Sequence, residues 1–532
     1  MTVRFPLLRP FSRGDVWAQT VVEAASFDAR AIHETGVPQA VLMENAGRSA
    51  AAVLTRLFDG SSVVGFIGSG NNGGDALVAL RTLQSWGYSV RAILVADRDG
   101  TDPLAHGWPV EVVSDTQLDE SGWREALAWA DVLMDGVLGT GARGAPRPRQ
   151  AEAIERLNDS GCPVMALDVP SGIDATTGEV PGSAVRADVT VCFGAPKLGA
   201  LLHPARALVG RHVTVEIGFP PLAKEDASVR VVTPQWARAQ RPRRGTDTHK
   251  NRVGRVLVVG GQVGMAGAVV LAARAAFHSG AGLVRVCSAP GTRDAIQAAL
   301  PEAIHLERGD VSALDDALAN SDAVVVGPGL GTDHDARSTL TQVTESGSTP
   351  LLLDADALNL AALSVIDLAA IGASRPVLIT PHAGEMSRLV AEEESAVGVG
   401  GGATAAGRVS TARAAADRFG CTVLFKGAPS VVAGPGGPIT VDTQSSSDLA
   451  VAGMGDTLGG VCGALLAQGV EPVTAGALGL YLSGRAARIA GRGAGLTPSD
   501  VVRWLPEALT EAGASSTDLD LPFVTFDADP AR

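Results

Sequence analysis

The sequence predicts a two-domain α/β protein, each domain built on a mostly parallel sheet between layers of helices. The first observation is length, because 532 residues exceed what one ordinary hydrophobic core accommodates. The second is composition, because 64 glycines and only 4% aromatic residues suit α/β layers with tight turns better than a β-sandwich. The third is the alternation of short apolar strands with helical segments in both halves, which implies parallel pairing with right-handed crossovers.

Breaks in this alternation divide the chain. Residues 218–248 contain proline and arginine and lack regular periodicity, apart from a short strand pattern at residues 229–232. Residues 513–532 are acidic and rich in serine and aspartate. We therefore expect an N-terminal domain over 1–220, a linker over 221–248, a C-terminal domain over 249–512 and a disordered tail over 513–532.

Charge and cysteine usage exclude several classes of protein. The net charge is −14 and no long basic tract is present, which argues against nucleic-acid binding. The five cysteines are scattered in apolar surroundings without a C-x-x-C pair, as in a reducing compartment. No apolar run has membrane-spanning length without glycine or charge, and no secretory h-region opens the chain. We expect a cytoplasmic protein with neither a nucleic-acid nor a membrane partner.

The stretch 451–460, VAGMGDTLGG, carries the clearest chemical signal. Gly453 and Gly455 precede Asp456, and residues 457–466 have a helical pattern. A glycine turn at a helix start exposes backbone N–H groups and partial positive charge, which favours an anion. Asp456 would repel a bound phosphate, so we interpret it as a base that deprotonates a hydroxyl during phosphoryl transfer. The alternative is a glycine-rich loop that merely opens a packed helix.

In the N-terminal half, polar residues follow several predicted strands. The strand at 62–68 runs into Ser69–Asp75 and then a helix over 76–86, whereas the strands at 130–135 and 163–168 end on Asp135 and Asp168. The carboxyl ends of parallel strands share one sheet edge, so Asp75, Asp135, Asp168 and Ser171 should converge there. The loop over residues 69–75 matches neither the G-x-G-x-x-G motif nor the Walker motif. Its oxygens suit either a hard cation or ribose hydroxyls.

Five separated blocks over residues 15–218 resemble the NAD(P)H-hydrate epimerase family: MENAGR, GSGNNGGD, DGVLGTG, LDVPSGIDATTG and FGAPKLG. The resemblance implies a Rossmann-like three-layer αβα domain in which Asp168 faces the reacting carbon beside Lys197. It also implies a potassium ion bound by Asn72, Asp135 and Ser171. The residues that it implies for the hydrated nicotinamide nucleotide are Asn71, Asn72, Gly73, Gly74, Asp75, Gly139, Thr140, Gly141, Ala142, Arg143, Gly144 and Ala145.

The half over residues 240–510 resembles the ADP-dependent NAD(P)H-hydrate dehydratases of the ribokinase-like superfamily. THK, GPGLG, DADALN, TPHAGEMSRL, KGA and GMGD occur in the family's order. The resemblance implies Asp456 as catalytic base, ADP as co-substrate and Mg²⁺ as cofactor. It places the hydrated cofactor against Ala268, Gly329 and His382. The residues that it implies for the adenine nucleotide are Lys426, Gly427, Ala428, Pro429, Ser430 and Gly455.

Together the two resemblances imply a bifunctional repair enzyme for hydrated NADH (NADHX) and hydrated NADPH (NADPHX). One half would interconvert the R and S epimers, and the other would dehydrate the S epimer with ADP, giving AMP and phosphate. The sequence leaves open ADP against ATP and the preference between the two hydrates. The alternative is a ribokinase-like vitamin kinase fused to a non-catalytic nucleotide-binding module. We also expect a homo-oligomer.

Overall fold

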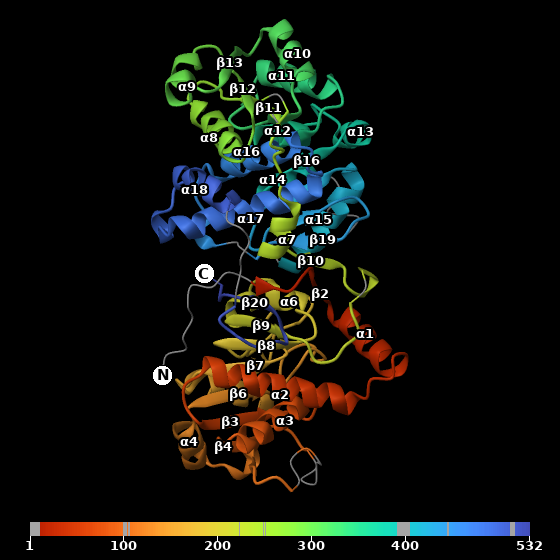
Figure 1. Ribbon diagram of the computed structural model, residues 1–532, viewed down its shortest axis with the longest axis vertical. Helices are drawn as coiled ribbons and strands as arrows, with labels where there is room; N and C mark the ends of the chain where they lie inside the picture. The colour runs from red at the N-terminus through yellow and green to blue at the C-terminus, as the bar shows by residue number, and fades with distance from the viewer. Residues whose placement is uncertain are drawn as a thin grey trace. The chain divides into compact units, whose positions relative to one another are not determined.

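The computed structural model describes residues 11–98, 104, 107–222, 224–247, 249–250, 252–390, 405–443, 446–510 and 517–531. The chain forms two compact units, unit 1 over Met1–Gln235 and Ser515–Arg532, and unit 2 over Trp236–Ala514. Each unit is an α/β structure with a parallel-rich sheet, which confirms the predicted fold class (Figure 1). The division between the units falls inside the predicted linker.

The central strands of unit 1 are parallel and fully buried, as their continuous apolar runs require. Parallel pairing extends from β9 to β5, whereas β20 is antiparallel to both β9 and β1. The strand order is β1 (Phe11–Ser12), β20 (Val524–Ala528), β9 (Arg211–Val215), β8 (Val189–Phe193), β7 (Val164–Leu167), β6 (Val132–Gly136), β3 (Ser62–Ile67), β4 (Ser89–Leu94) and β5 (Glu111–Ser114).

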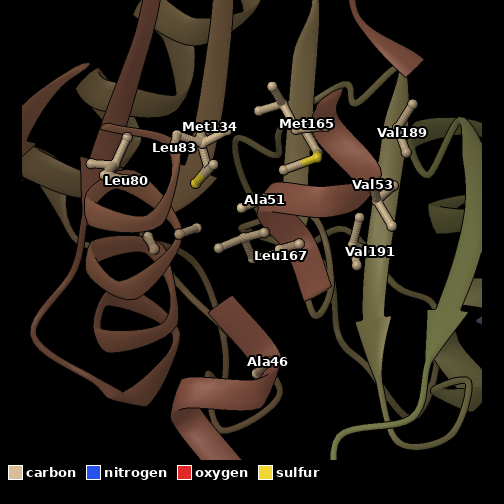
Figure 2. Close-up of a cluster of buried hydrophobic side chains, with 14 of the residues drawn as sticks. Ala46, Ala51, Val53, Leu80, Leu83, Met134, Met165, Leu167, Val189 and Val191 are labelled. Carbon is tan, nitrogen blue, oxygen red and sulfur yellow. The ribbon is translucent and has the colours of Figure 1, made fainter. Parts of the chain in front are cut away.

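Helices cover both faces of this sheet and give the predicted three layers. On one face, α2 (Gln39–Leu57) and α3 (Asn71–Ser85) pack over the strands through Ala51, Leu80 and Met165 (Figure 2). On the other face, α4 (Glu120–Trp129) and α5 (Pro148–Asp159) bury a second apolar cluster. Unit 1 also contains α1 (Val21–His33), α6 (Leu198–Leu201) and the antiparallel pair β2 (Val16–Ala18) and β10 (Val229–Val231), the last at the predicted strand.

The prediction of a disordered tail is wrong for the residues that the structure describes after 516. Residues 524–528 form β20, which lies between β1 and β9 in the sheet of unit 1. The physical reason is long-range, because Asp527 in β20 is buried against Arg211 in β9. Residues 511–516 of the predicted domain end and tail lie outside the described residues.

Unit 2 has a parallel sheet extended by two antiparallel strands. Parallel pairing joins β13 to β17, and β17, β18 and β19 then pair antiparallel. The order is β13 (Ile304–Glu307), β12 (Leu283–Ser288), β11 (Arg255–Gly260), β14 (Ala323–Val326), β15 (Leu351–Leu353), β16 (Val377–Ile379), β17 (Thr422–Phe425), β18 (Val431–Ala433) and β19 (Ile439–Val441).

The central helix α16 (Met454–Ala467) packs closely against α8 (Ala266–His278) because of its small residues. A Cβ on Gly460 would lie 2.0 Å from the carbonyl oxygen of Ala272, so only glycine permits this approach. The remaining helices are α7 (Pro234–Gln240), α9 (Arg293–Ala299), α10 (Val311–Ala319), α11 (His334–Glu345), α12 (Asp356–Ala362), α13 (Leu368–Ser374), α14 (Ala383–Val390), α15 (Ala405–Phe419), α17 (Pro472–Ala490) and α18 (Pro498–Thr510).

Candidate active sites

Unit 1 contains a cavity of about 580 Å³ at the carboxyl ends of its central strands. Nine of the predicted site residues line it: Asn71, Asn72, Asp75, Gly139, Thr140, Gly141, Ala142, Asp168 and Lys197. The other predicted residues of this half are not part of the lining: Gly73, Gly74, Asp135, Arg143, Gly144, Ala145 and Ser171. Gly73 and Gly74 instead face inward, since a Cβ on them would meet the Gly68 carbonyl and the Met43 side chain.

Helix α3 begins at Asn71, five residues earlier than the sequence pattern predicts. Asn71 to Asp75 therefore form its first turn rather than a loop before it. The apolar signal starts only at Ala76, because the preceding polar and glycine residues face the cavity or the neighbouring backbone. The consequence is a helix N-terminus at the cavity wall, where free N–H groups and the helix dipole favour an anionic group such as phosphate.

Asp168 and Lys197 form an ion pair in the cavity, with Nζ 3.2 Å from Oδ1. Lys197 is buried, and Nζ also donates to the carbonyls of Phe193 and Ala195, each at 3.0 Å. Burial lowers the pKa of Lys197, but attraction to Asp168, Cys192 and Asp28 and the hydrogen bond to Asp168 together outweigh it, so the pKa is raised and the ammonium stays protonated. Thr140 donates from its backbone N–H, at 3.1 Å, and from its hydroxyl to Oδ2 of Asp168.

Asp168 also has an unusual backbone conformation, with φ at +62°. Non-glycine residues rarely adopt left-handed dihedrals, and aspartate and asparagine tolerate them best. The conformation directly follows β7 and orients the carboxylate toward Thr140 and Lys197. Such strain at a strand end is typical of functional positions.

Further carboxylates share the cavity with Asp168. Burial and repulsion from Asp168 raise the pKa of Asp75 well above its usual range. The pKa of Asp28 is also raised, by burial and by Asp168, against an opposing effect of Lys197. Asp28 lies on α1 and was not among the predicted site residues, because it belongs to none of the glycine-rich blocks. These carboxylates can therefore hold protons nearer neutral pH than free aspartate does.

The backbone of Leu138 connects three predicted residues beside the cavity, Asp135, Ser171 and Asn72. Ser171 donates to Asp135 from its N–H, at 2.8 Å, and from its hydroxyl, at 2.6 Å. The Leu138 N–H donates to the Ser171 hydroxyl, and the Asn72 amide donates to the Leu138 carbonyl. Burial raises the pKa of Asp135 to about 6, although the hydrogen bonds that it accepts from Ser171 and from the Val137 N–H oppose the rise. The Oδ1 atom of Asn72 is buried without a hydrogen-bond partner.

In unit 2, the glycine turn and two charged residues from other strands meet at the start of α16. The helix begins at Met454, three residues earlier than predicted, so Gly455 and Asp456 lie in its first turn. Lys426, after β17, contacts Asp354, after β15, with Nζ 2.7 Å from Oδ1. A Cβ on Gly455 would lie 3.4 Å from Nζ of Lys426 and 3.6 Å from Oδ2 of Asp354. The pair therefore lies directly against the anion-favouring turn.

The electrostatics of this cluster favour Asp456 as a base near neutral pH. Burial and repulsion from Asp354 raise the pKa of Asp456 to about 6, while Lys426 opposes the rise. Burial lowers the pKa of Lys426, but Asp354 and Glu385 outweigh it and the pKa is raised. Asp354 was not among the predicted site residues, although the DADALN block contains it. Asp354 and Lys426 are neighbours only in the folded sheet, where the ends of β15 and β17 place them together.

The other predicted residues of unit 2 fall into three places. Gly329 contacts α8, since its Cβ would lie 3.3 Å from that of Ala268. His382 is 54% exposed, with Nε2 3.4 Å from Oε1 of Glu385. The loop over residues 426–430 closes on itself, because the Ser430 hydroxyl accepts from the Gly427 N–H at 3.2 Å and lies 3.0 Å from its carbonyl. Glu385, buried between His382 and Lys426, was not predicted either.

Two negative findings concern only the described residues. None of the helices there is long and apolar enough to cross a membrane. Nor do three or more histidine, cysteine, aspartate or glutamate side chains gather there in a cluster that could hold a metal ion.

The two α/β folds, each with polar residues gathered at its strand ends, are those of a two-site enzyme of the nucleotide-binding class. Comparisons with known proteins identify the family. Residues 256–507 match the family model for NAD(P)H-hydrate dehydratase, and residues 39–199 match that for the YjeF-related protein N-terminus. Proteins named bifunctional NAD(P)H-hydrate repair enzyme Nnr match almost the whole chain, and the chain belongs to this family.

The protein from Moorella thermoacetica is 34% identical, over 92% of this chain and 96% of its own length. The protein from Salinibacter ruber is 37% identical, over 86% and 89%, and that from Escherichia coli is 34% identical, over 84% of each. Among solved structures, the ADP/ATP-dependent NAD(P)H-hydrate dehydratase from Bacillus subtilis, co-crystallised with ATP and Mg²⁺, is 26% identical. It covers 53% of this chain and 97% of its own, with a TM-score of 0.44.

Proposed function

We propose that unit 1 interconverts the R and S epimers of hydrated NADH and NADPH, and that unit 2 dehydrates the S epimer with ADP. The products would be the reduced cofactor, AMP and phosphate. The observation that carries the proposal is Asp456, a carboxylate with a pKa of about 6 in the first turn of α16, beside the Lys426–Asp354 pair. Membership of the bifunctional repair family supports both activities.

The chemistry of unit 2 needs a base and an anion site, and the Asp456 region offers both. The hydrated ring carries a hydroxyl on the carbon beside the ring nitrogen, and hydroxide is a poor leaving group. Asp456 removes the hydroxyl proton while the oxygen attacks the β-phosphorus of ADP, which releases AMP. The nitrogen lone pair then expels phosphate, and loss of a proton from the adjacent carbon restores the reduced ring.

Lys426 and Asp354 have supporting roles in this proposal. The ammonium of Lys426 lies beside Gly455, where it can stabilise negative charge on the transferred phosphoryl group. Asp354 holds Lys426 in place and keeps the pKa of Asp456 high by repulsion. The N–H groups at the start of α16 add further stabilisation. Mg²⁺, which we expect to accompany the nucleotide, would neutralise part of the phosphate charge.

In unit 1, Asp168 and Lys197 would act on the same carbon of the substrate. Inverting that carbon requires that one of its bonds break and re-form on the opposite face. Removal of the hydroxyl proton turns the carbon into a carbonyl while its bond to the ring nitrogen opens and the nitrogen takes up a proton. Reclosure on the other face returns the proton to the oxygen and gives the other epimer. Asp168 can accept the proton, and the protonated Lys197 beside it can stabilise the carboxylate and donate in return. The N-terminus of α3, with Asn71 and Asn72 at the cavity wall, would bind the phosphates of the substrate nucleotide.

A potassium ion fits the residues that we expect to hold it. The buried Oδ1 of Asn72 lacks a hydrogen-bond partner, and such an atom is costly unless a ligand satisfies it. Asp135 supplies one negative charge and Ser171 a hydroxyl oxygen close by. Bound there, the ion would compensate the buried charge of Asp135 and fix the loop that carries Leu138. The homo-oligomeric state and the cytoplasmic location stay predictions from the sequence.

The decisive experiment incubates mixed epimers of hydrated NADH with the full chain and either ADP or ATP. Recovery of the reduced-nicotinamide absorbance together with release of phosphate is the expected result. A phosphorylated product that retains its phosphate would instead indicate a kinase, such as the vitamin kinase that the sequence left open. Absence of both products with either nucleotide would contradict the dehydratase proposal.

A further inference from the structure

Arg408 contacts the loop over residues 426–430, for which the family resemblance implies adenine-nucleotide binding, although it lies 18 residues before Lys426 in sequence. It is the fourth residue of α15 and is half-buried. Its Cζ atom is 5.3 Å from the centre of the Phe425 ring, and its Nη1 donates to the carbonyl of Lys426 at 3.1 Å. The guanidinium is thus held by the two residues that lead into the loop.

The contact with the next loop residue is closer still. A Cβ on Gly427 would lie 1.5 Å from Nη1 and 2.4 Å from Cζ of Arg408. Only a glycine therefore allows the guanidinium to lie against this part of the backbone. The same glycine begins the turn that Ser430 closes. The guanidinium therefore packs directly against the backbone of the loop.

No carboxylate in the described part of the chain forms an ion pair with Arg408. Its Nε is buried without a hydrogen-bond partner, and burial alone lowers its pKa. Arginine nevertheless stays protonated in proteins, so among the described residues this half-buried positive charge has no acidic partner. The buried Arg211 differs, since it pairs with Asp527. Arg375 also lacks an ion pair and has an unpartnered Nε, but its guanidinium donates to three backbone carbonyls, whereas one such bond is recorded for Arg408.

We propose that Arg408 binds the phosphate groups of the adenine nucleotide and thereby favours phosphorylated nucleotides over the nucleoside. The inference rests on the proposed function of unit 2 and adds a residue outside the loop itself. A planar guanidinium matches phosphate oxygens with two parallel hydrogen bonds, and the ligand would supply the missing negative charge. Adenosine, which has no phosphate group, would gain no binding affinity from this charge.

The test measures binding of ADP and of adenosine to the full chain by calorimetry, without hydrated cofactor. Arg408→Gln removes the charge but keeps a donor for the Lys426 carbonyl, and Arg408→Met removes both. We expect both variants to weaken ADP binding by about 10- to 100-fold, the usual range for a hydrogen bond to a charged group. Adenosine binding should change less than about twofold. Arg413→Met, an exposed position on the same helix, is the matched control.

Each outcome decides between the alternatives. ADP binding by Arg408→Gln equal to that of the unsubstituted chain would overturn the inference while leaving the proposed function intact. An equal loss of ADP and adenosine binding would also overturn it, because Arg408 would then only shape the loop. Failure of the unsubstituted chain to bind either ADP or ATP would overturn both the inference and the proposed function.

Discussion

Arg211 and Asp527 form a fully buried ion pair between neighbouring strands of unit 1, with 0% and 1% of their side chains exposed. Two parallel hydrogen bonds join them, from Nε to Oδ1 at 2.9 Å and from Nη2 to Oδ2 at 2.7 Å. The partners are 316 residues apart, and unit 2 occupies most of the intervening chain. Asp518 provides a second carboxylate for the same guanidinium. The C-terminal segment is therefore part of unit 1.

Replacing Asp527 by alanine should destabilise unit 1. Removal of Asp527 leaves Arg211 with only the partly exposed Asp518 as an acidic partner, and breaking a buried pair usually costs about 3–5 kcal/mol of unfolding free energy. Denaturant unfolding of the full chain measures this change, with epimerase activity as a local readout. Asp518→Asn is the control, because its side chain is 36% exposed and Arg211 keeps its buried partner Asp527, so we expect a cost of about 0–1 kcal/mol. Equal unfolding midpoints for Asp527→Ala and the unsubstituted chain would contradict the structural role.

The sequence could not reveal β20 because its stabilisation is almost entirely non-local. The C-terminal segment offers only the short run Phe523–Phe526 as strand-forming residues, among aspartates and prolines that are typical of disorder. Its pairing with β9 and the neutralisation of Arg211 depend on residues about three hundred positions earlier. By contrast, the predicted strands at 62–68 and 163–168 agree with β3 and β7 to within about one residue at each end, since continuous apolar runs are local signals.

The same distinction applies to the sites. Asp168, Lys197 and Asp456 lie in motifs that can be read along the chain, and the structure places the first two 3.2 Å apart. Asp354 and Arg408 act through partners 72 and 18 residues away, so no local spacing marks them. The starts of α3 and α16 were predicted too late, because glycines and polar residues in a first helical turn hide the helical period.

Asp456→Asn should lower the dehydratase rate by roughly 10²–10⁴, the usual range for loss of a general base. The asparagine has nearly the same shape, so binding of ADP should persist. Steady-state recovery of the reduced cofactor and calorimetric ADP binding together measure the two effects. Turnover close to that of the unsubstituted chain would exclude Asp456 as the base.

The dehydratase rate should fall as the pH falls through about 6. The pKa of Asp456 is raised to about 6, and only its ionised form accepts a proton, so activity appears above this pH and is lost below it. Asp354→Asn removes a repelling charge and frees Lys426 to attract Asp456, and both changes lower the pKa. The inflection of the pH–rate profile should therefore move to lower pH. An upward shift would contradict this account of the electrostatics.

Epimerase activity should depend on a monovalent cation rather than a divalent one. Asn72, Asp135 and Ser171 offer oxygen ligands with one full negative charge, too little for a tight divalent site. Replacing potassium by a bulky organic cation should reduce epimerisation, whereas a divalent-metal chelator should not. Asn72→Leu should abolish the potassium dependence. Metal analysis that found stoichiometric zinc or calcium bound to unit 1 would rule out the assignment.

The last prediction tests whether the two units act separately on one substrate. Each has its own carboxylate and its own helix N-terminus at strand ends. Asparagine is the suitable replacement for Asp168, because alanine would be strained at a φ of +62°. Asp168→Asn should leave dehydration of the pure S epimer intact and slow repair of the R epimer to the spontaneous interconversion rate. A mixture of epimers should then be repaired in two phases, a fast one for the S portion and a slow one for the R portion.

Asp456→Asn should instead equilibrate the epimers without restoring the reduced cofactor. Loss of S-epimer dehydration in a folded Asp168→Asn protein would mean that the two sites are shared or coupled.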